Sequence, residues 1–243
     1  MNIHLLFKKF KNNYRYIFFI VLLLSLSACL KDNDAQHGSI PGTLVSIVHA
    51  SPDAGPLVMG INGSRIDNQS FNFGNRIIYQ LLYPGSYQFQ TNRAADNKAL
   101  DIKHWSLQAG MCYTIFATDR VDSLELLGVR DFEYGDQPLE NHSKVRFINL
   151  CPDSLSLDLE ASSIDTLLAN NKKFKENTPF GDIPAIDSSA VYRLNILNHE
   201  SNTSLTSLEF RPKEGKYYTI MASGFMETED DAQKFKAFIL EHD

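Results

Sequence analysis

The feature that most constrains the fold is an internal repeat with a period of about 100 residues. Val45–Ala54 reads VSIVHASPDA and aligns with Val145–Ser154, which reads VRFINLCPDS. A second pair of segments, Gly110–Ala117 and Gly215–Ala222, reads GMCYTIFA and GKYYTIMA. Because both pairs keep their order and approximate spacing, we interpret the chain as two tandem copies of one unit.

The pattern of apolar residues predicts that each unit is all-β. Alternation with a period of two places Val45, Ile47 and His49 on one face of a strand. The dipeptide Asn62-Gly63 predicts a hairpin turn, because both residues tolerate a positive φ. About seven short strands per unit, separated by turns, predict two tandem immunoglobulin-like antiparallel β-sandwich domains. Three further sets repeat the alternation, namely Leu57, Met59 and Ile61; Leu155, Leu157 and Leu159; and Tyr192, Leu194 and Ile196.

Two segments are predicted to lie outside this strand pattern. The best helical candidate is Asp165–Lys175, for which we expect a short turn or helix. The polar segment Asp131–Lys144 is the expected linker between the two units. We therefore place the first domain at residues 43–136 and the second at residues 137–243, each expected to fold separately because each has about 100 residues.

Residues 1–28 have the composition of an export signal. Four basic residues precede a 12-residue apolar run, Ile17–Ala28, and no acidic residue occurs before Asp32. This run is shorter than the roughly 20 apolar residues that span a bilayer. Leu26-Ser-Ala-Cys29 resembles the bacterial lipobox, which implies removal of the leader and attachment of a lipid to Cys29. Residues 29–42 are then a flexible tether.

Charge and cysteine content exclude several classes of function. Removal of the leader takes away four positive charges and changes the net charge from −6 to −10, which argues against a nucleic-acid partner. Cys112 and Cys151 lie in different units, and they either pair outside the cytoplasm or remain half-buried thiols. The seven histidines and three cysteines show no metal-binding spacing, so we expect no metal and no cofactor.

Val48–Ala54, which reads VHASPDA, resembles the hallmark of the bacterial domain of unknown function 4397 family. The Asn62-Gly63 turn, the PGSY sequence of Pro84–Tyr87 and the GxxYT sequence of Gly110–Thr114 extend the resemblance over about residues 43–243. The second unit departs from it, with Asn-Leu-Cys at Asn149–Cys151 in place of His-Ala-Ser. The resemblance implies β-sandwich domains, single or in tandem, in exported and lipid-anchored proteins, and no established activity.

The sequence offers few catalytic candidates. His49, Ser51 and Asp53 share a face of an extended strand, but successive members would lie about 7 Å apart, too far for nucleophile–base contact. The second unit keeps only Pro152 and Asp153 of this motif, so we interpret it as a strand-ending turn in which Asp accepts backbone hydrogen bonds. Glu227–Asp231 lacks the spaced ligands of a calcium loop. Trp105 is either a core residue or a platform for a sugar.

Two further motifs concern modification and location. An Asp-Ser/Thr-aliphatic pattern at Ser123, Ser154 and Thr166 resembles the O-glycosylation sequon of Bacteroidetes. Leu30–Asp34, which reads LKDND, resembles the signal that sends Bacteroidetes lipoproteins to the cell surface. The alternative is an ordinary linker, with the domains facing the periplasm.

Taken with the leader, these features predict an outer-membrane, surface-exposed lipoprotein that binds a glycan or an envelope protein and is not an enzyme. One alternative is a structural accessory subunit of an outer-membrane complex, and a minor one is a hydrolase. The expected partners are the membrane, through the lipid, and a glycan or envelope protein.

Overall fold

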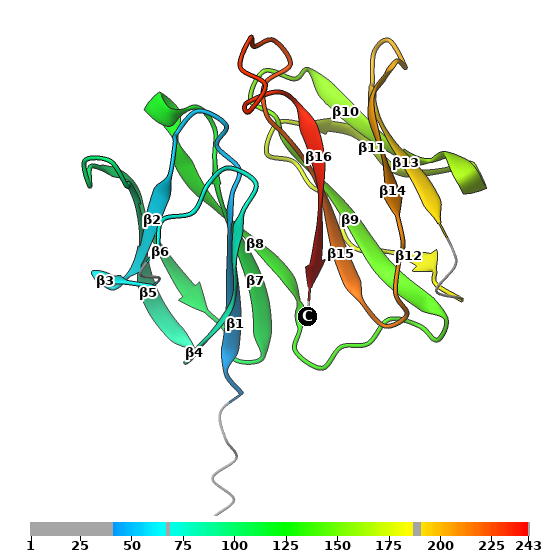
Figure 1. The fold of residues 1–243 in the computed structure, drawn as a ribbon. Coiled ribbons are helices and arrows are strands. Elements are labelled where there is room, and N and C mark those ends of the chain that lie inside the picture. Colours follow the sequence, from blue (N-terminus) through cyan, green and yellow to red (C-terminus); the bar gives the residue numbers. More distant parts are fainter. Residues whose placement is uncertain (1–40, 67–68, 187–190, 243) are drawn as a thin grey trace, which may run out of the picture. The chain divides into compact units, whose positions relative to one another are not determined.

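The computed structural model describes residues 41–66, 69–186 and 191–242, so the leader and Cys29 lie outside the described residues. The described residues form sixteen strands in four sheets (Figure 1). Their only helical elements are two short 3-10 turns, Val121–Ser123 and Ser162–Ile164. No helix among them is long and apolar enough to cross a membrane. The all-β prediction is confirmed.

The first eight strands form a sandwich of two four-stranded sheets, with strand orders β4-β1-β7-β8 and β3-β2-β5-β6. Strands β1 and β7 pair in parallel, from Leu44 opposite Cys112 to His49 opposite Ala117, and the other pairs are antiparallel. A core that includes Ile47, Met59 and Phe89 fills the space between the sheets. The strands are β1 (Thr43–His49), β2 (Leu57–Ile61), β3 (Ser64–Arg65), β4 (Arg76–Leu82), β5 (Gly85–Arg93), β6 (Ala99–Leu107), β7 (Met111–Thr118) and β8 (Glu125–Glu133).

The other eight strands form a second sandwich, with strand orders β12-β9-β15-β16 and β11-β10-β13-β14. Strands β9 and β15 pair in parallel, as β1 and β7 do in the first sandwich. Its core includes Phe147, Leu159 and Phe210. The strands are β9 (His142–Leu150), β10 (Ser156–Ala161), β11 (Thr166–Lys173), β12 (Gly181–Pro184), β13 (Tyr192–Asn198), β14 (Ser204–Phe210), β15 (Tyr217–Ser223) and β16 (Lys236–His242).

A third apolar core joins the two sandwiches. Val48 of β1 and Phe116 of β7 pack in one cluster with Ile148 of β9 and Met221 of β15. These residues alternate along their strands with residues that face the sandwich cores, such as Ile47 and Phe147. Strands β1, β7, β9 and β15 are therefore covered on both faces, so each is buried along almost its whole length.

Several sequence predictions need correction. The helix expected within Asp165–Lys175 was wrong, because this segment forms β11 and pairs with β10. Ala169 of β11 is buried in the second core, so tertiary pairing overrides the weak helical pattern. Leu155 was expected on a buried face but is 63% exposed in the loop before β10. The connection between β8 and β9 is residues 134–141, shorter than the predicted Asp131–Lys144, and each sandwich has eight strands rather than about seven.

The two described cysteines are free thiols. Cys112 lies in β7, and Cys151 directly follows β9, and both are buried. Burial raises the pKa of each thiol to about 12, with Asp131 as a further cause at Cys112 and Asp153 at Cys151. Both thiols are therefore protonated at neutral pH and behave as small apolar groups.

Candidate functional site

The side chains of His49, Ser51 and Asp53 each bind a different backbone group. Nε2 of His49 lies 2.7 Å from the carbonyl oxygen of Gly55. The Ser51 hydroxyl donates to the carbonyl oxygen of Asp119 at 2.6 Å, and the Asp53 carboxylate accepts the Val121 N–H at 2.8 Å. These contacts connect the end of β1 to the segment after β7, which fits a structural turn better than a catalytic set.

His49 is buried among aromatic rings. Its imidazole lies 5.4 Å from the Phe71 ring and 6.3 Å from the Phe73 ring, centre to centre. Nδ1 has no hydrogen-bond partner among the described residues. Burial therefore lowers the pKa of His49 to about 4, although the bond to Gly55 opposes this shift. The ring is neutral at neutral pH, with Nε2–H donating to Gly55.

The corresponding turn of the second sandwich uses different side chains for the same purpose. Asp153 accepts the Met226 N–H at 3.0 Å and the Cys151 thiol at 3.2 Å. The Asn149 amide donates to the carbonyl oxygen of Lys172 at 3.0 Å. The aspartate is thus the part of the repeated motif that holds a distant backbone N–H in both sandwiches.

The remaining predicted residues are dispersed. Ser123 and Thr166 are exposed, whereas Ser154 is half-buried and donates to the carbonyl oxygen of Cys151 at 3.0 Å. Trp105 is half-buried and packs against the first core, with its ring 5.3 Å from Phe89. Residues 227–231 lie in the loop between β15 and β16, and no group of residues in the described part of the chain could hold a metal ion.

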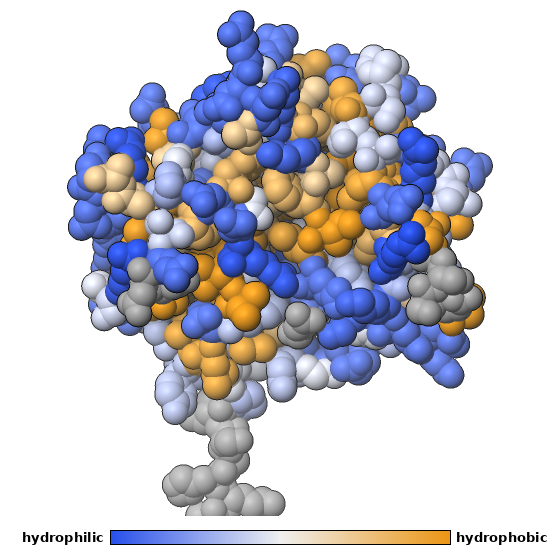
Figure 2. Space-filling model, viewed as in Figure 1, coloured by the Kyte–Doolittle hydropathy of each residue, from blue (hydrophilic) through white to orange (hydrophobic). Residues whose placement is uncertain are grey.

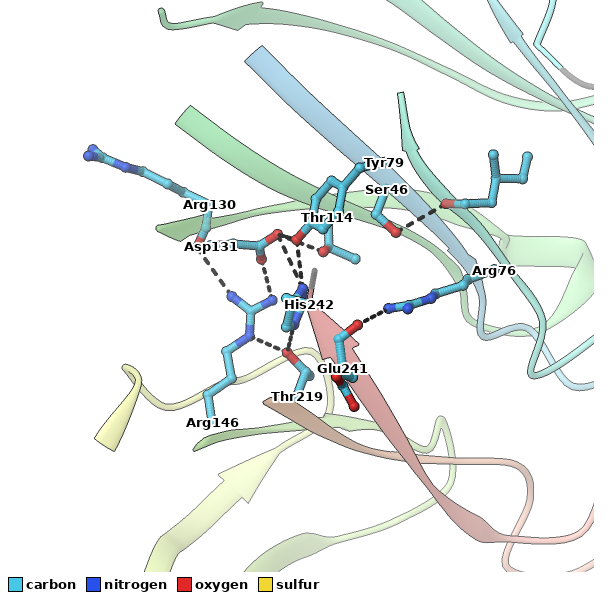
Figure 3. Close-up of polar contacts among 11 residues, drawn as sticks. Ser46, Arg76, Tyr79, Thr114, Arg130, Asp131, Arg146, Thr219, Glu241 and His242 are labelled. Carbon is cyan, nitrogen blue, oxygen red and sulfur yellow. Dashed lines mark hydrogen bonds and ion pairs between the residues drawn. The ribbon is translucent and has the colours of Figure 1, made fainter. Parts of the chain in front are cut away.

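The structure brings together a polar cluster that the sequence did not reveal, at the boundary between the sandwiches (Figure 3). The guanidinium of Arg146 in β9 forms an ion pair with Asp131 of β8, and both side chains are fully buried. Arg146 also donates to the Thr219 hydroxyl at 2.8 Å. Asp131 accepts hydrogen bonds from the hydroxyls of Tyr79 at 3.0 Å and Thr114 at 2.7 Å.

His242 completes this cluster. Its Nδ1 lies 2.6 Å from the Tyr79 hydroxyl, and its Nε2 lies 2.7 Å from the Thr219 hydroxyl. One set of proton positions satisfies all these contacts: His242 Nδ1–H donates to Tyr79, Tyr79 donates to Asp131, and Thr219 donates to His242 Nε2. Burial and the nearby Asp131 carboxylate raise the pKa of Tyr79 far above its ordinary value, so its hydroxyl keeps its proton.

Three aromatic side chains gather beside the polar cluster. Phe132 and Tyr217 are stacked, with ring centres 4.2 Å apart and planes 20° apart. The Phe180 ring meets Tyr217 edge-on at 5.1 Å, and the Arg146 guanidinium lies 4.6 Å from the centre of the Phe180 ring. Phe132 and Phe180 remain partly exposed, so the aromatic group presents apolar surface to solvent.

These side chains line a groove with a volume of about 650 Å³. A second depression of about 430 Å³ shares Phe132, Asp136 and Tyr217 with it, so the two are adjacent. Charged side chains line the groove beside the aromatic rings. Lys144 is one of them, and its ammonium pairs with the Asp182 carboxylate at 2.8 Å. Burial, followed by the charges of Asp136 and Asp182, raises the pKa of Tyr217, so its hydroxyl remains a hydrogen-bond donor. We call this feature the seam groove; its further lining residues are Arg130, Asp131, Glu133, Arg146, Asn177, Thr178, Pro179 and Phe180.

Sequence reasoning missed the seam groove because its residues come from four separated segments. Phe132 falls in the segment that was interpreted as a linker. Tyr217 falls in the repeated segment Gly215–Ala222, and no expectation falls on Phe180. One feature of the sequence could have indicated a buried polar cluster. Arg146 is a charged residue within a mostly apolar strand sequence, VRFINL.

Comparison with known protein families finds a match to part of the chain. Residues 43–160 match the family described as Domain of unknown function (DUF4397). This match takes in the whole first sandwich, β9 and most of β10, and it confirms the resemblance over those residues. No curated protein shows significant sequence similarity to the chain.

Solved structures give only distant likenesses. One shows alpha-glucan recognition by family 41 carbohydrate-binding modules from streptococcal virulence factors, with 12% identity, a TM-score of 0.23, and coverage of 74% of this chain and 92% of that one. The CBM26 module of Eubacterium rectale Amy13K in complex with maltoheptaose has 10% identity, a TM-score of 0.25, and coverage of 79% and 100%. The fimbrial anchor protein Mfa2 from Porphyromonas gingivalis has 8% identity, a TM-score of 0.23, and coverage of 82% and 97%. At such TM-scores these likenesses carry no argument about function.

Proposed function

We propose that this chain is a lipid-anchored protein of the cell envelope that binds a glycan in the seam groove without catalysing a reaction. The observation that carries the proposal is the pair of partly exposed rings, Phe132 and Phe180, which pack on the buried Tyr217 beside the charged pair Lys144 and Asp182. A sugar ring has apolar C–H faces and polar hydroxyls at its edge. Such a ligand matches an aromatic surface that is bordered by hydrogen-bonding groups.

One carboxylate that lines the groove and one beside it are already engaged. Asp131 is enclosed, and its oxygens are already used by Arg146, Tyr79 and Thr114. Asp182 is held by the Lys144 ammonium. A glycosidase needs two carboxyl groups that can reach the scissile bond from both sides. Hydrolysis would therefore have to use the exposed Glu133 and Asp136, which also line the groove, and it stays the minor alternative.

We further propose that the two sandwiches are tandem immunoglobulin-like domains, with their boundary near residues 136 and 137. The support is twofold: the sequence repeat, and the shared order of strands around the parallel pairs β1–β7 and β9–β15. The leader and Leu26–Cys29 support attachment of a lipid to Cys29 in the outer membrane. Leu30–Asp34 supports display at the cell surface, and the exposed hydroxyls of Ser123 and Thr166 are accessible for O-glycosylation.

Binding of the purified protein to an array of immobilised oligosaccharides tests the glycan proposal. Phe180→Ala should weaken binding about fivefold, because an aromatic contact contributes about 1 kcal/mol. Lys144→Ala should also weaken it, through loss of a donor at the rim. Phe174→Ala is the matched control, since Phe174 is a half-buried phenylalanine that does not line the groove.

Equal effects of Phe180→Ala and Phe174→Ala would contradict the assignment of the groove. If no glycan is retained and one envelope protein co-purifies in a fixed ratio, the accessory-subunit alternative replaces the glycan proposal. Thermal melting of each variant separates loss of binding from loss of folding.

A further inference from the structure

Large apolar side chains are exposed at the end of the first sandwich where the described chain begins. Leu81 and Tyr83, at the end of β4, are 73% and 80% exposed, and Tyr134 is 71% exposed. Leu81 lies directly against Gly42, and Gly42 accepts the Gly110 N–H at 2.9 Å. Gly110 in turn accepts the Tyr134 N–H at 2.6 Å, so these residues form one surface. We call Pro41, Leu81, Tyr83 and Tyr134 the tether-end patch.

The surroundings of this patch carry almost no charge. Three stretches lie at this end of the sandwich, residues 41–44, 80–87 and 106–112, and none contains Asp, Glu, Lys or Arg, although 21% of the chain is charged. Tyr134 lies at the edge of this uncharged region, because Glu133 and Asp136 flank it in the chain. Figure 2 shows hydrophobic residues gathered over β4 and the start of β1. An exposed, uncharged surface of this kind indicates contact with an apolar or interfacial partner.

The position of the patch along the chain indicates which partner. Cys29 precedes Pro41 by twelve residues. Even fully extended, twelve residues span at most about 43 Å. A lipid on Cys29 would therefore keep the patch permanently close to the membrane surface, at a high effective concentration.

We propose that the tether-end patch contacts the headgroup region of the leaflet that holds the lipid on Cys29. This inference rests on the lipid attachment proposed above. Tyrosine suits this environment because its ring is apolar and its hydroxyl is polar, and tyrosines are enriched at membrane–water interfaces. The missing charges remove the cost of taking ions out of water. The patch thus orients the first sandwich on the membrane, which a flexible tether alone would not do.

Tryptophan fluorescence of the lipidated full chain tests this orientation. Tyr83→Trp is placed in phosphatidylcholine vesicles whose acyl chains carry bromine, a quencher of tryptophan emission. Leu155→Trp is the matched control, because Leu155 is also an exposed apolar residue but follows the far end of β9. The hydroxyl of Ser223 donates to the carbonyl oxygens of both Ala50 and Leu150, so the far ends of β1 and β9 lie together, away from the patch.

We expect the emission of Tyr83→Trp to lose intensity and shift to shorter wavelength in the brominated vesicles, and that of Leu155→Trp to stay unchanged. Trp105 contributes the same background to both variants. Unquenched emission from both, with the protein still bound to the vesicles, would overturn the proposal. A blue shift that requires no lipid and grows with protein concentration would assign the patch to a second copy instead.

The same two variants can be tethered to nickel-chelating lipid through a histidine tag that replaces Cys29. This arrangement tests the patch independently of lipid attachment at Cys29. Quenching of Tyr83→Trp in this arm supports the patch even if Cys29 carries no lipid. Absence of quenching in this arm overturns it whatever the state of Cys29. Failure of the anchor itself is detected independently, as a lack of lipid on Cys29.

Discussion

Arg146 of β9 and Asp131 of β8 form an ion pair across the boundary between the two sandwiches, with side chains that are 1% and 0% exposed. Each partner is also hydrogen-bonded to hydroxyl groups, which come from Thr219, Tyr79 and Thr114. The pair is thus held by residues of both sandwiches, next to the apolar core that joins them. A ligand in the seam groove would lie against both sides of this boundary.

Removal of one partner of the ion pair should be far more damaging than removal of both. Arg146→Met is expected to lower the free energy of unfolding by about 3–5 kcal/mol, because Asp131 is left as an unpaired buried charge. The double variant Asp131→Leu with Arg146→Met should recover part of this loss. Urea denaturation measures each value. Arg211→Met, which removes an exposed pair with Glu209, is the control and should change little.

His49 should make the protein less stable in acid. Its folded-state pKa of about 4 lies below the ordinary value of 6.5, so between these pH values the unfolded chain binds a proton that the folded chain does not. The free energy of unfolding should therefore fall by about 3 kcal/mol as the pH drops through this window. His49→Gln keeps a donor for Gly55 and should flatten the dependence, whereas the exposed His104→Gln should not. The free energy of unfolding is measured by urea denaturation at each pH. The same pH dependence in His49→Gln and in the unsubstituted protein would contradict this explanation.

The aspartates of the repeated turn should matter for stability and not for binding. Asp53→Ala leaves the Val121 N–H without its acceptor, and Asp153→Ala does the same to the Met226 N–H. Each change should lower the free energy of unfolding by about 1 kcal/mol, and substitution by Asn, which keeps an acceptor oxygen, should restore much of it. A loss of ligand binding in His49→Ala at an unchanged melting temperature would instead point to a functional role for the motif.

Local patterns were sufficient for the features that depend on neighbouring residues. The alternation of Tyr192, Leu194 and Ile196 predicted a strand with one buried face, and all three side chains lie in the second core. The Asn62-Gly63 turn was also correct, since the two residues have φ angles of 50° and 78°. Both features are determined within a few residues of the chain.

Features that depend on distant partners could not be predicted in this way. The second buried face of β1, with Val48, is covered by β9 and β15, which lie about 100 and about 170 residues later. β11 is a strand because it pairs with β10, although its own sequence, TLLANNKK, has weak strand propensity. The seam groove needs Phe132, Phe180 and Tyr217 to meet, and no local pattern carries that information.

Lipid attachment at Cys29 should determine where the protein is found. Cys29→Ala is expected to abolish labelling with a fatty-acid analogue and to release the protein from membranes, because the sulfur that carries the lipid is absent. Cys112→Ala is the matched control, since its thiol is buried and should carry no lipid. Labelling that persists in Cys29→Ala and disappears in another cysteine variant would contradict the lipobox interpretation.

Separation of the two sandwiches should show how much of their stability is shared. Residues 41–136 and 137–243, produced apart, should each keep a β-type circular dichroism spectrum, because each retains its own core between two sheets. Each should melt below the intact chain, since Val48 and Phe116 on one side and Ile148 and Met221 on the other lose their apolar cover. When mixed, the halves should form a 1:1 complex with a higher melting temperature, and Arg146→Met in the second half should weaken it. Halves that melt at the temperature of the intact chain and do not associate would show that the buried boundary contributes little, and that the sandwiches are independent domains.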